Sequence, residues 1–150
     1  MLTWERILEF IAKGNPTPPF RIIKSNEEWR EILTTKQFEV TRQKSTERPF
    51  TGEYCSSFEA GVYNCVCCGT KLFSSINKYE TGSGWPSFSQ PVQENVVKYK
   101  ADNSFGMMRI ETICNVCNSH LGHVFPDGPP PTELRYCINS AALIKVSEEK

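Results

Sequence analysis

The sequence predicts a mainly β protein of a single domain, in which short helices are confined to the N-terminal segment. Helical spacing of apolar residues occurs only within about the first 45 residues. From Pro49 onward, glycines and prolines divide the chain into short segments, several of which alternate apolar and polar residues as half-buried strands do. Because no helical pattern separates these segments, antiparallel hairpins are favoured over βαβ units. We therefore expect a helical segment over residues 1–45 that packs on a β body over residues 46–150.

Three short helices are expected in the N-terminal segment. The first ends at Gly14, and its apolar residues have the spacing of one helix face, namely Trp4, Ile7, Leu8 and Ile11. The stretch "NPTPP" then predicts a stiff turn. Ser25, followed three residues later by Glu28, has the pattern of a capping box and predicts the start of the second helix. A third helix is expected over residues 35–44.

The strands of the β body are expected within five segments: "GVYNCVC", "KLFSSINKYE", "VVKYKAD", "FGMMRIETIC" and "LRYCINSAALIKV". Alternation in the fourth segment predicts two faces, one with Met108, Ile110 and Thr112 and the other with Met107, Arg109 and Glu111. Two further stretches are expected to be loops. One is "TGSGWPSF", where the Trp85 ring is better suited to line a pocket than to fill a core, and the other is "SHLGHVFPDGPPP".

Composition excludes several functional classes. Seventeen basic residues balance seventeen acidic ones, so the charge gives no reason to expect a nucleic-acid or membrane partner. The longest apolar runs, such as "AALI", are far too short to span a bilayer. The N-terminal "MLTWERILEF" carries charges within its apolar pattern and lacks a small-residue cleavage site, so it is a poor signal peptide. We expect a soluble, cytoplasmic protein.

Seven cysteines are an odd number for a secreted disulfide scaffold, and four of them form two C-x2-C pairs. In a reducing compartment such pairs more often bind metal or carry out redox chemistry. Four thiolates suit a closed, tetrahedral, structural Zn²⁺ site that would join two distant hairpins, with the ligands Cys65, Cys68, Cys114 and Cys117. Gly69 favours Cys68 over Cys67 as a ligand, because glycine accepts the positive φ that such turns often need. The alternatives are two redox pairs or a disulfide.

The two histidines do not fit the metal site. In "CNVCNSHLGH" both the distance from the cysteines and the distance between His120 and His123 are too short for a zinc finger. A zinc deaminase is excluded because the H-x-E partner of its cysteine pair is missing. The histidines are therefore available for other chemistry.

Cys137 stands apart from the other cysteines, in "RYCINSAAL". An isolated cysteine is often only a small buried hydrophobic residue, but one with histidines elsewhere in the chain is also a candidate nucleophile. Arg135 and any protonated histidine nearby would favour its thiolate. The lone thiol and the two unusual loops together suggest a site.

Five stretches carry a resemblance to a known family. "TERPFTGEY", "GVYNCVCCGTKLF", "TGSGWPSF", "HLGHVFPDGP" and "RYCINSAAL" occur in the order and at the spacing of the B-type methionine-R-sulfoxide reductases. The resemblance runs from about Phe38 to Val146, so the first 37 residues lie outside it. It implies two twisted antiparallel sheets, with a structural zinc on the side away from the active site.

The resemblance also implies an activity, which is reduction of the R epimer of methionine sulfoxide to methionine. Cys137 matches the nucleophile, and His123 and His120 match an active-site pair in which we expect His123 to be the proton donor and His120 its orienting partner. Trp85 matches the residue whose ring packs on the substrate methyl group. The remaining expected roles are hydrogen bonding to the sulfoxide or a site water for Asn139, positioning or polarising the nucleophile for Arg135, and closing the pocket wall or filling the core for Phe125.

Attack by Cys137 would leave a sulfenic acid that must be reduced. Many family members use a second cysteine at the position of Ser83, which this chain lacks. Cys67 is expected to lie with the metal, so we hypothesise that Cys55 forms a disulfide with Cys137, which thioredoxin then reduces. The alternative is that an external thiol reduces Cys137 directly. Methionine-sulfoxide-containing proteins or peptides are the expected substrates, and the free amino acid is a further candidate.

Two other classes of function compete with this interpretation. One is a zinc-stabilised binding module without catalysis, which the intact "RYCIN" and the paired histidines disfavour. The other is a thiol-dependent hydrolase, for which the sequence has no oxyanion signature. Asp127 is a candidate orienting acid for such an enzyme, but in "PDGPP" a turn role fits better.

Overall fold

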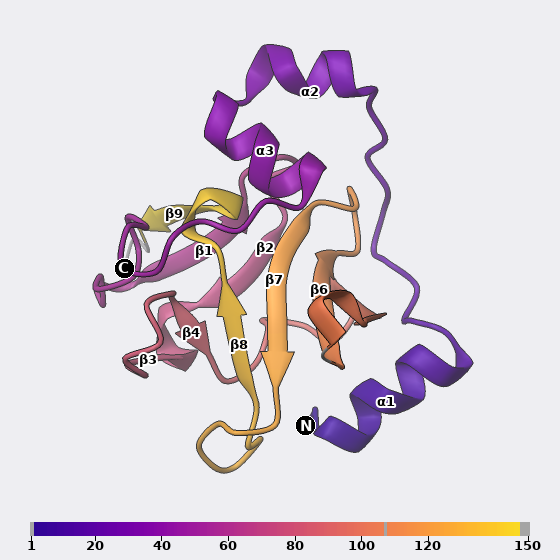
Figure 1. The fold of residues 1–150 in the computed structure, drawn as a ribbon, viewed down its shortest axis with the longest axis vertical. Helices are drawn as coiled ribbons and strands as arrows, with labels where there is room; N and C mark the ends of the chain where they lie inside the picture. The colour runs from indigo at the N-terminus through magenta and orange to yellow at the C-terminus, as the bar shows by residue number, and fades with distance from the viewer. Residues whose placement is uncertain (1, 107, 148–150) are drawn as a thin grey trace.

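The computed structural model describes residues 2–106 and 108–147, and it confirms the predicted fold class. Within these residues three helices precede the strands (Figure 1). The helices are α1 (Trp4–Lys13), α2 (Asn26–Ile32) and α3 (Thr35–Gln43). The strands are β1 (Gly61–Cys65), β2 (Lys71–Ser74), β3 (Lys78–Tyr79), β4 (Ser87–Phe88), β5 (Val97–Asp102), β6 (Arg109–Cys114), β7 (His120–Phe125), β8 (Arg135–Ile138) and β9 (Leu143–Ser147). Short 3₁₀ turns occupy Ser75–Asn77, Ser104–Gly106 and Ser140–Ala142.

The strands form two antiparallel sheets, as expected. The smaller has the order β2–β1–β9, and the larger has the order β3–β4–β8–β7–β6–β5. Sequence neighbours β6 and β7 form a hairpin, and β8 returns beside β7 after a loop that contains a cis Pro130–Pro131 peptide bond. The chain thus passes from the larger sheet to the smaller one between β8 and β9, through the turn Ser140–Ala142.

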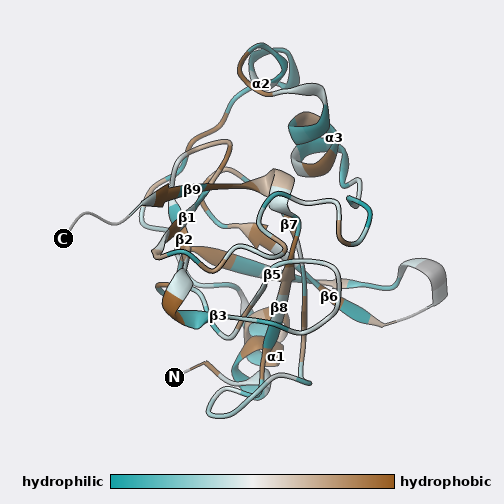
Figure 2. Ribbon diagram, turned by 90° about the vertical axis from the view of Figure 1, so that its left-hand side faces the viewer, coloured by the Kyte–Doolittle hydropathy of each residue, from teal (hydrophilic) through white to brown (hydrophobic). Residues whose placement is uncertain are grey.

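Aromatic side chains from both sheets form the centre of the core. The Phe73 ring on β2 stacks on the Phe88 ring on β4 at 4.5 Å between centroids, and the Tyr63 ring on β1 meets Phe88 edge-on at 5.2 Å. Tyr136 on β8 joins the same cluster. Each such ring contributes roughly 1.5–3 kcal/mol by its burial. Figure 2 shows hydrophobic residues along β7, at the centre of the molecule, whereas α2 lies at its edge.

The second and third helices begin where the sequence predicts. Ser25 and Glu28 form the expected capping box, and a second one, between Thr34 and Gln37, opens α3. On α1, Phe10 stacks on Tyr99 of β5 at 6.0 Å. Buried side chains of all three helices belong to the same core cluster as those of the strands, while the boundary at residue 45 stays a prediction. No helix within residues 2–106 and 108–147 is long and apolar enough to cross a membrane.

Two predictions about strands are wrong. The histidine stretch, expected to be a loop, forms strand β7 up to Phe125, and the proline-rich loop begins only after it. Strand β6 is also not the half-buried strand that the alternation predicts, because its residues from Ile110 to Cys114 are buried on both faces. Glu111 is buried by polar partners, and Met108 precedes the strand and is 84% exposed. Met107 lies outside the described residues.

Candidate active site and metal cluster

The four cysteines of the C-x2-C pairs gather at one point between the two sheets. Cys65 ends β1 and Cys114 ends β6, so that one pair comes from each sheet. Their sulfur atoms all lie within 4.8 Å of one another, whereas Cys67 is not part of this group. The second cysteine of the first pair is therefore Cys68 and not Cys67, as the position of Gly69 predicts.

The two turns that carry these cysteines have the same backbone design. The residue after the second cysteine donates its N–H to the carbonyl of the first at 2.9 Å, in Gly69 to Cys65 and in Asn118 to Cys114. Both residues have positive φ, 80° for Gly69 and 67° for Asn118. Asparagine is one of the few residues besides glycine that adopts this conformation readily. The repeated turn directs both sulfur atoms of a pair toward the centre of the cluster.

The geometry of the cluster fits a tetrahedral metal ion. A Zn²⁺ ion with four thiolate ligands at about 2.3 Å requires sulfur atoms about 3.8 Å apart. The sulfur atoms of Cys65 and Cys117 are 3.6 Å apart, and those of Cys68 and Cys114 are 3.7 Å apart. Hydrogen bonds from the other thiols, that of Cys114 foremost, hold the pKa of the Cys117 thiol well below its ordinary value.

A separate cavity of about 340 Å³ contains most of the residues predicted for the active site. Its walls include Trp85, His123, Phe125, Arg135, Cys137 and Asn139. His120 lies behind this wall, in contact with the His123 ring at 5.8 Å between centroids. Cys55 and the metal cluster do not line the cavity. The predicted thiol, aromatic rings and one imidazole are thus brought together in one place.

Cys137 and His123 are cross-strand neighbours at the bottom of this cavity. They are directly opposite in the β8–β7 pairing, so their side chains share one face of the sheet. Gly122, beside His123, also lines the cavity, and a Cβ there would come 2.1 Å from the carbonyl oxygen of Cys137. Only glycine therefore allows β7 and β8 to approach this closely next to the thiol.

Burial opposes ionisation of both side chains. It raises the pKa of the Cys137 thiol, although Arg135 and a hydrogen bond with Ser83 favour the thiolate. Burial likewise lowers the pKa of His123, against the effect of its hydrogen bond with Asp102. Arg135 therefore acts in the predicted direction on Cys137, but desolvation has the larger effect.

An irregularity between β6 and β7 places both histidines on the same face. Residues three apart in a regular strand point to opposite faces, but here Thr112 pairs with Gly122 and Ile113 with His120, which leaves Leu121 as the extra residue on β7. Such a bulge re-aims a side chain. His120 can therefore contact His123, while its own Nδ1 bonds a carboxylate of β6.

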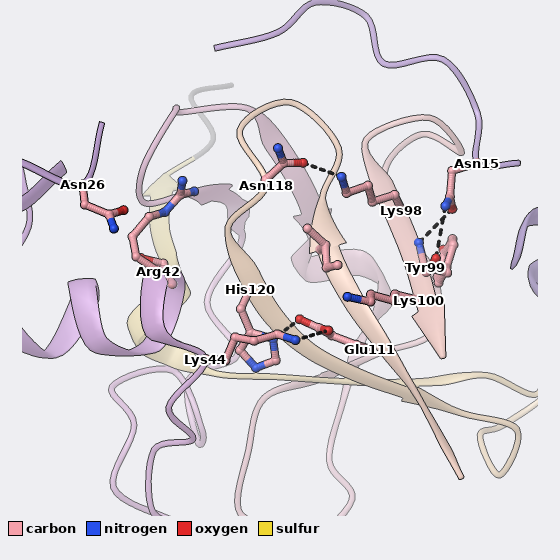
Figure 3. Close-up of a pocket in the computed structure, with 12 residues that line it drawn as sticks. Asn15, Asn26, Arg42, Lys44, Lys98, Tyr99, Lys100, Glu111, Asn118 and His120 are labelled. Carbon is pink, nitrogen blue, oxygen red and sulfur yellow. Dashed lines mark hydrogen bonds and ion pairs between the residues drawn. The ribbon is translucent and has the colours of Figure 1, made fainter. Parts of the chain in front are cut away.

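Each imidazole has its own carboxylate, which the sequence analysis did not predict. Nδ1 of His120 lies 2.7 Å from a carboxylate oxygen of Glu111, and the other oxygen of Glu111 lies 3.0 Å from the Lys44 ammonium (Figure 3). Nε2 of His123 lies 2.7 Å from Oδ2 of Asp102. The imidazole beside it holds the pKa of Asp102 well below its usual range. These pairs fix the orientation of both rings.

Arg135 is held by contacts on two sides. Its guanidinium donates to both carboxylate oxygens of Asp127 at 2.8 and 3.2 Å, and it lies over the Phe125 ring at 4.3 Å from the centroid. Asp127 lies in the loop between β7 and β8, and its carboxylate is the partner of Arg135. Phe125 is half-buried and lines the cavity, which favours the pocket wall over the core for this ring.

Glu47 is a buried residue that connects several parts of the site, and the sequence analysis did not predict it. Its carboxylate accepts the backbone N–H groups of Ser140 and Ala141 at 2.9 and 3.0 Å. Its carbonyl oxygen accepts the Trp85 indole N–H at 3.1 Å, and its own N–H donates to the side-chain oxygen of Asn139. It lies in the quoted stretch "TERPFTGEY", but an acidic residue in a predicted loop gave no sign of burial.

The amide of Asn139 is engaged by the backbone at both ends. In addition to the Glu47 contact, its side-chain nitrogen donates to the carbonyl of Leu121 at 3.0 Å. Asn139 is only 3% exposed. Its two hydrogen bonds connect the loop that contains Glu47 to strand β7. Its expected contact with a substrate oxygen stays a prediction.

One cavity contains a thiol, an imidazole and an aromatic wall, and the cluster of four cysteines lies outside it. This arrangement is typical of a cysteine-dependent oxidoreductase. The SelR domain family model matches residues 33–147. Proteins with the name peptide methionine sulfoxide reductase MsrB are similar to this chain. The protein from Saccharophagus degradans is 58% identical over 80% of this chain and 90% of its own length. The protein from Hahella chejuensis is 56% identical over 82% of this chain and 88% of its own length. That of Pseudomonas aeruginosa is 55% identical over 86% of this chain and 98% of its own length. The chain belongs to the SelR domain family.

Proposed function

We propose that this protein reduces methionine sulfoxide in proteins and peptides to methionine, and that it acts on the R epimer. The observation that carries the proposal is the placement of Cys137 opposite His123 in a cavity with an aromatic wall. The names of the relatives support the same substrate. A thiol is the electron donor that the reaction requires, and the rings of Trp85 and Phe125 offer an apolar surface to the methyl group on the substrate sulfur.

The chemistry begins with the Cys137 thiolate, which attacks the sulfoxide sulfur. Protonation of the sulfoxide oxygen is needed, because an unprotonated oxygen is a very poor leaving group. Since Nε2 of His123 is bonded to Asp102, we assign the proton delivery to Nδ1 of this ring. The S–O bond of the substrate and the sulfur–sulfur bond formed in the attack then break, and an S–O bond forms on Cys137. Cys137 is left as a sulfenic acid, and the substrate sulfur gains two electrons and becomes a thioether.

Recycling of the sulfenic acid needs a second thiol. We propose that the Cys55 thiol attacks the sulfenic acid and releases water, so that a Cys55–Cys137 disulfide forms, and that thioredoxin reduces it by dithiol exchange. Cys55 is half-buried and outside the cavity, so this step requires the 51–60 loop to move. Direct reduction of Cys137 by an external thiol is the competing route.

The cysteine cluster has a structural role in this proposal. We propose that Cys65, Cys68, Cys114 and Cys117 bind Zn²⁺, which would join the β1–β2 turn of one sheet to the β6–β7 turn of the other. All four positions of a tetrahedral ion would be filled by sulfur, as is typical of structural sites.

Epimer-resolved turnover tests the function. The reduced, metal-loaded protein is mixed with a peptide that contains either the R or the S epimer, and methionine is measured with dithiothreitol as the reductant. We expect turnover of the R epimer only, and none with Cys137→Ser. Equal rates for both epimers would contradict the stereochemical assignment. Absence of turnover with either epimer would contradict the function and favour a binding module.

A further inference from the structure

A second cavity, of about 470 Å³, lies on the sheet beside the candidate active site. Side chains of α3, β5 and β6 converge on it, and Asn26 at the start of α2 approaches from the far side (Figure 3). Polar contacts from Lys44 to Glu111 and from Glu111 to His120 connect it to the Cys137 site, where the His120 ring contacts His123. Neither the reaction nor the metal site proposed above uses this cavity.

The cavity is strongly basic. Four cationic side chains line it, Arg42, Lys44, Lys98 and Lys100, against the single carboxylate of Glu111. Four positive charges minus one negative charge leave three positive charges on the lining side chains when His120 is neutral. The neighbouring cysteine cluster offsets part of this excess, because Arg42 also contacts the Cys117 sulfur. The chain as a whole has no net charge, so this excess is a local concentration. Adjacent cations of this kind repel one another unless an anion lies between them.

The strand register explains how two of the lysines come together. Lys98 and Lys100 are two residues apart on β5, so their side chains stand on the same face. They are opposite Ile113 and Glu111 on β6. Burial, followed by the charges of Arg21 and Lys100, lowers the pKa of Lys98 against the opposing effects of Cys114 and Glu111. The strand backbone therefore places both lysines on the same sheet face, and neither forms an ion pair with a carboxylate among the described residues.

The helix supplies the other two cations from across the cavity. Arg42 donates to the carbonyl oxygen of Cys117 at 2.9 Å and to its sulfur atom at 3.3 Å, and it lies over the Trp29 ring. Its Nε is buried without a hydrogen-bond partner. Lys44 follows α3 in the left-handed conformation, with a φ of 59°, and this directs its chain back over Glu111. Among the described residues, none of the ion pairs joins Arg42, Lys98 or Lys100 to a carboxylate.

We propose that this cavity binds a small multivalent anion, held between Lys98 and Lys100 of β5 and Arg42 and Lys44 of the α3 end. Its volume is within the range of small-molecule sites. Phosphate esters and polycarboxylates share the required chemistry, which is two or more anionic groups that match cations from opposite walls. Asn118, whose side-chain oxygen accepts from the Lys98 ammonium, offers a further amide at the rim.

Calorimetric titration of the full-length, metal-loaded protein tests this site. The probes are fructose 1,6-bisphosphate for phosphate esters and tricarballylate for polycarboxylates, each at constant ionic strength. We expect one molecule of at least one probe to bind per chain. Binding of only one probe assigns the ligand to that class, and binding of neither overturns the proposal.

Two double variants separate a built site from general electrostatic attraction. Lys98→Gln with Lys100→Gln removes the strand pair and is expected to weaken binding at least tenfold. Lys36→Gln with Lys71→Gln removes two exposed lysines outside the cavity and should change the affinity less than twofold. Equal losses in both double variants would overturn the proposal. Thermal unfolding of each variant verifies that the fold is intact.

Discussion

Cys137 and His123 lie directly opposite each other on β8 and β7, and burial moves their pKa values apart. The thiol is made a weaker acid, and the imidazole is made a weaker base. In the reaction proposed above, the productive form has the thiol ionised and the ring protonated. That form is therefore a small fraction of the free protein at neutral pH. A bound sulfoxide would favour it, because its oxygen accepts a hydrogen bond from the protonated ring.

The pH dependence of kcat/KM follows from these two shifts. Below the pKa of His123 the ring is already protonated and further acid only removes thiolate, so the rate falls. Above the pKa of Cys137 the thiol is already ionised and further base only removes the ring proton, so the rate falls again. We expect a plateau whose acidic limb lies below pH 6.5 and whose alkaline limb lies above pH 9.0, the ordinary values of the two groups.

Asp102→Asn tests which group produces the acidic limb. The Asp102 carboxylate raises the pKa of His123, so its neutralisation should move the acidic limb to lower pH and lower the plateau. Glu59→Gln removes an acid that is 86% exposed on its side chain, and it should leave the profile unchanged. An acidic limb that stays in place in Asp102→Asn would show that His123 does not produce it.

Glu47→Gln is expected to destabilise the protein. The carboxylate accepts two backbone N–H groups with its two oxygens, whereas an amide would direct an NH₂ group at one of these donors. We expect the free energy of unfolding in urea to fall by about 1–3 kcal/mol, which is the cost of a buried hydrogen bond left unmade. Glu53→Gln, on an exposed neighbour, should change it by less than about 0.5 kcal/mol. Equal effects of the two substitutions would contradict the role of Glu47.

Local patterns predicted much of this protein. The helix starts, the two C-x2-C turns and the position of Gly69 depend on residues close together in sequence, and all of them match the structure. Trp85 and Cys137 stood out because their surroundings are unusual for their residue types, and they line one cavity.

Other features depend on residues far apart in sequence, and no local pattern signals them. Strand β7 contains a bulge, so its histidines do not alternate with apolar residues in the regular way. Glu47 and Asp102 look like ordinary acidic residues of a loop and a strand end until their partners, 92 and 21 residues away, are placed beside them. The local pattern also gives no sign that Glu111 is buried, because its burial depends on contacts with Lys44 and His120.

Loss of the proposed zinc ion is expected to destabilise the protein strongly. Cys114→Ser deletes one ligand of the cluster, and the binding free energy of such an ion is largely folding free energy. We expect less than one metal ion per chain by plasma mass spectrometry and a loss of several kcal/mol in the free energy of unfolding. Cys67→Ser is the matched control, since this cysteine shares the turn but not the cluster. It should retain one ion per chain, and loss of the ion from this variant would contradict the ligand assignment.

The recycling route is tested by counting thiols after a single turnover. We expect the wild type to lose two free thiols and to form a Cys55–Cys137 disulfide, which peptide mapping detects. Cys55→Ser should instead keep Cys137 as a sulfenic acid that a dimedone probe captures, and turnover with thioredoxin should fall at least tenfold. Cys67→Ser should behave as the wild type. Unchanged thioredoxin turnover in Cys55→Ser would establish that an external thiol reduces Cys137.

Ser83→Cys in the Cys55→Ser background is the converse experiment. Ser83 and Cys137 line the same cavity, and their side chains interact by a hydrogen bond, so a thiol at position 83 would begin close to the sulfenic acid without movement of the 51–60 loop. We expect a disulfide between the introduced thiol and Cys137 after one turnover, and recovery of thioredoxin-dependent turnover. Ser57→Cys, on the same loop as Cys55, is the control for a thiol that is merely nearby and should not restore it. If Ser83→Cys leaves the sulfenic acid in place, the cavity does not bring these two side chains within bonding distance during catalysis.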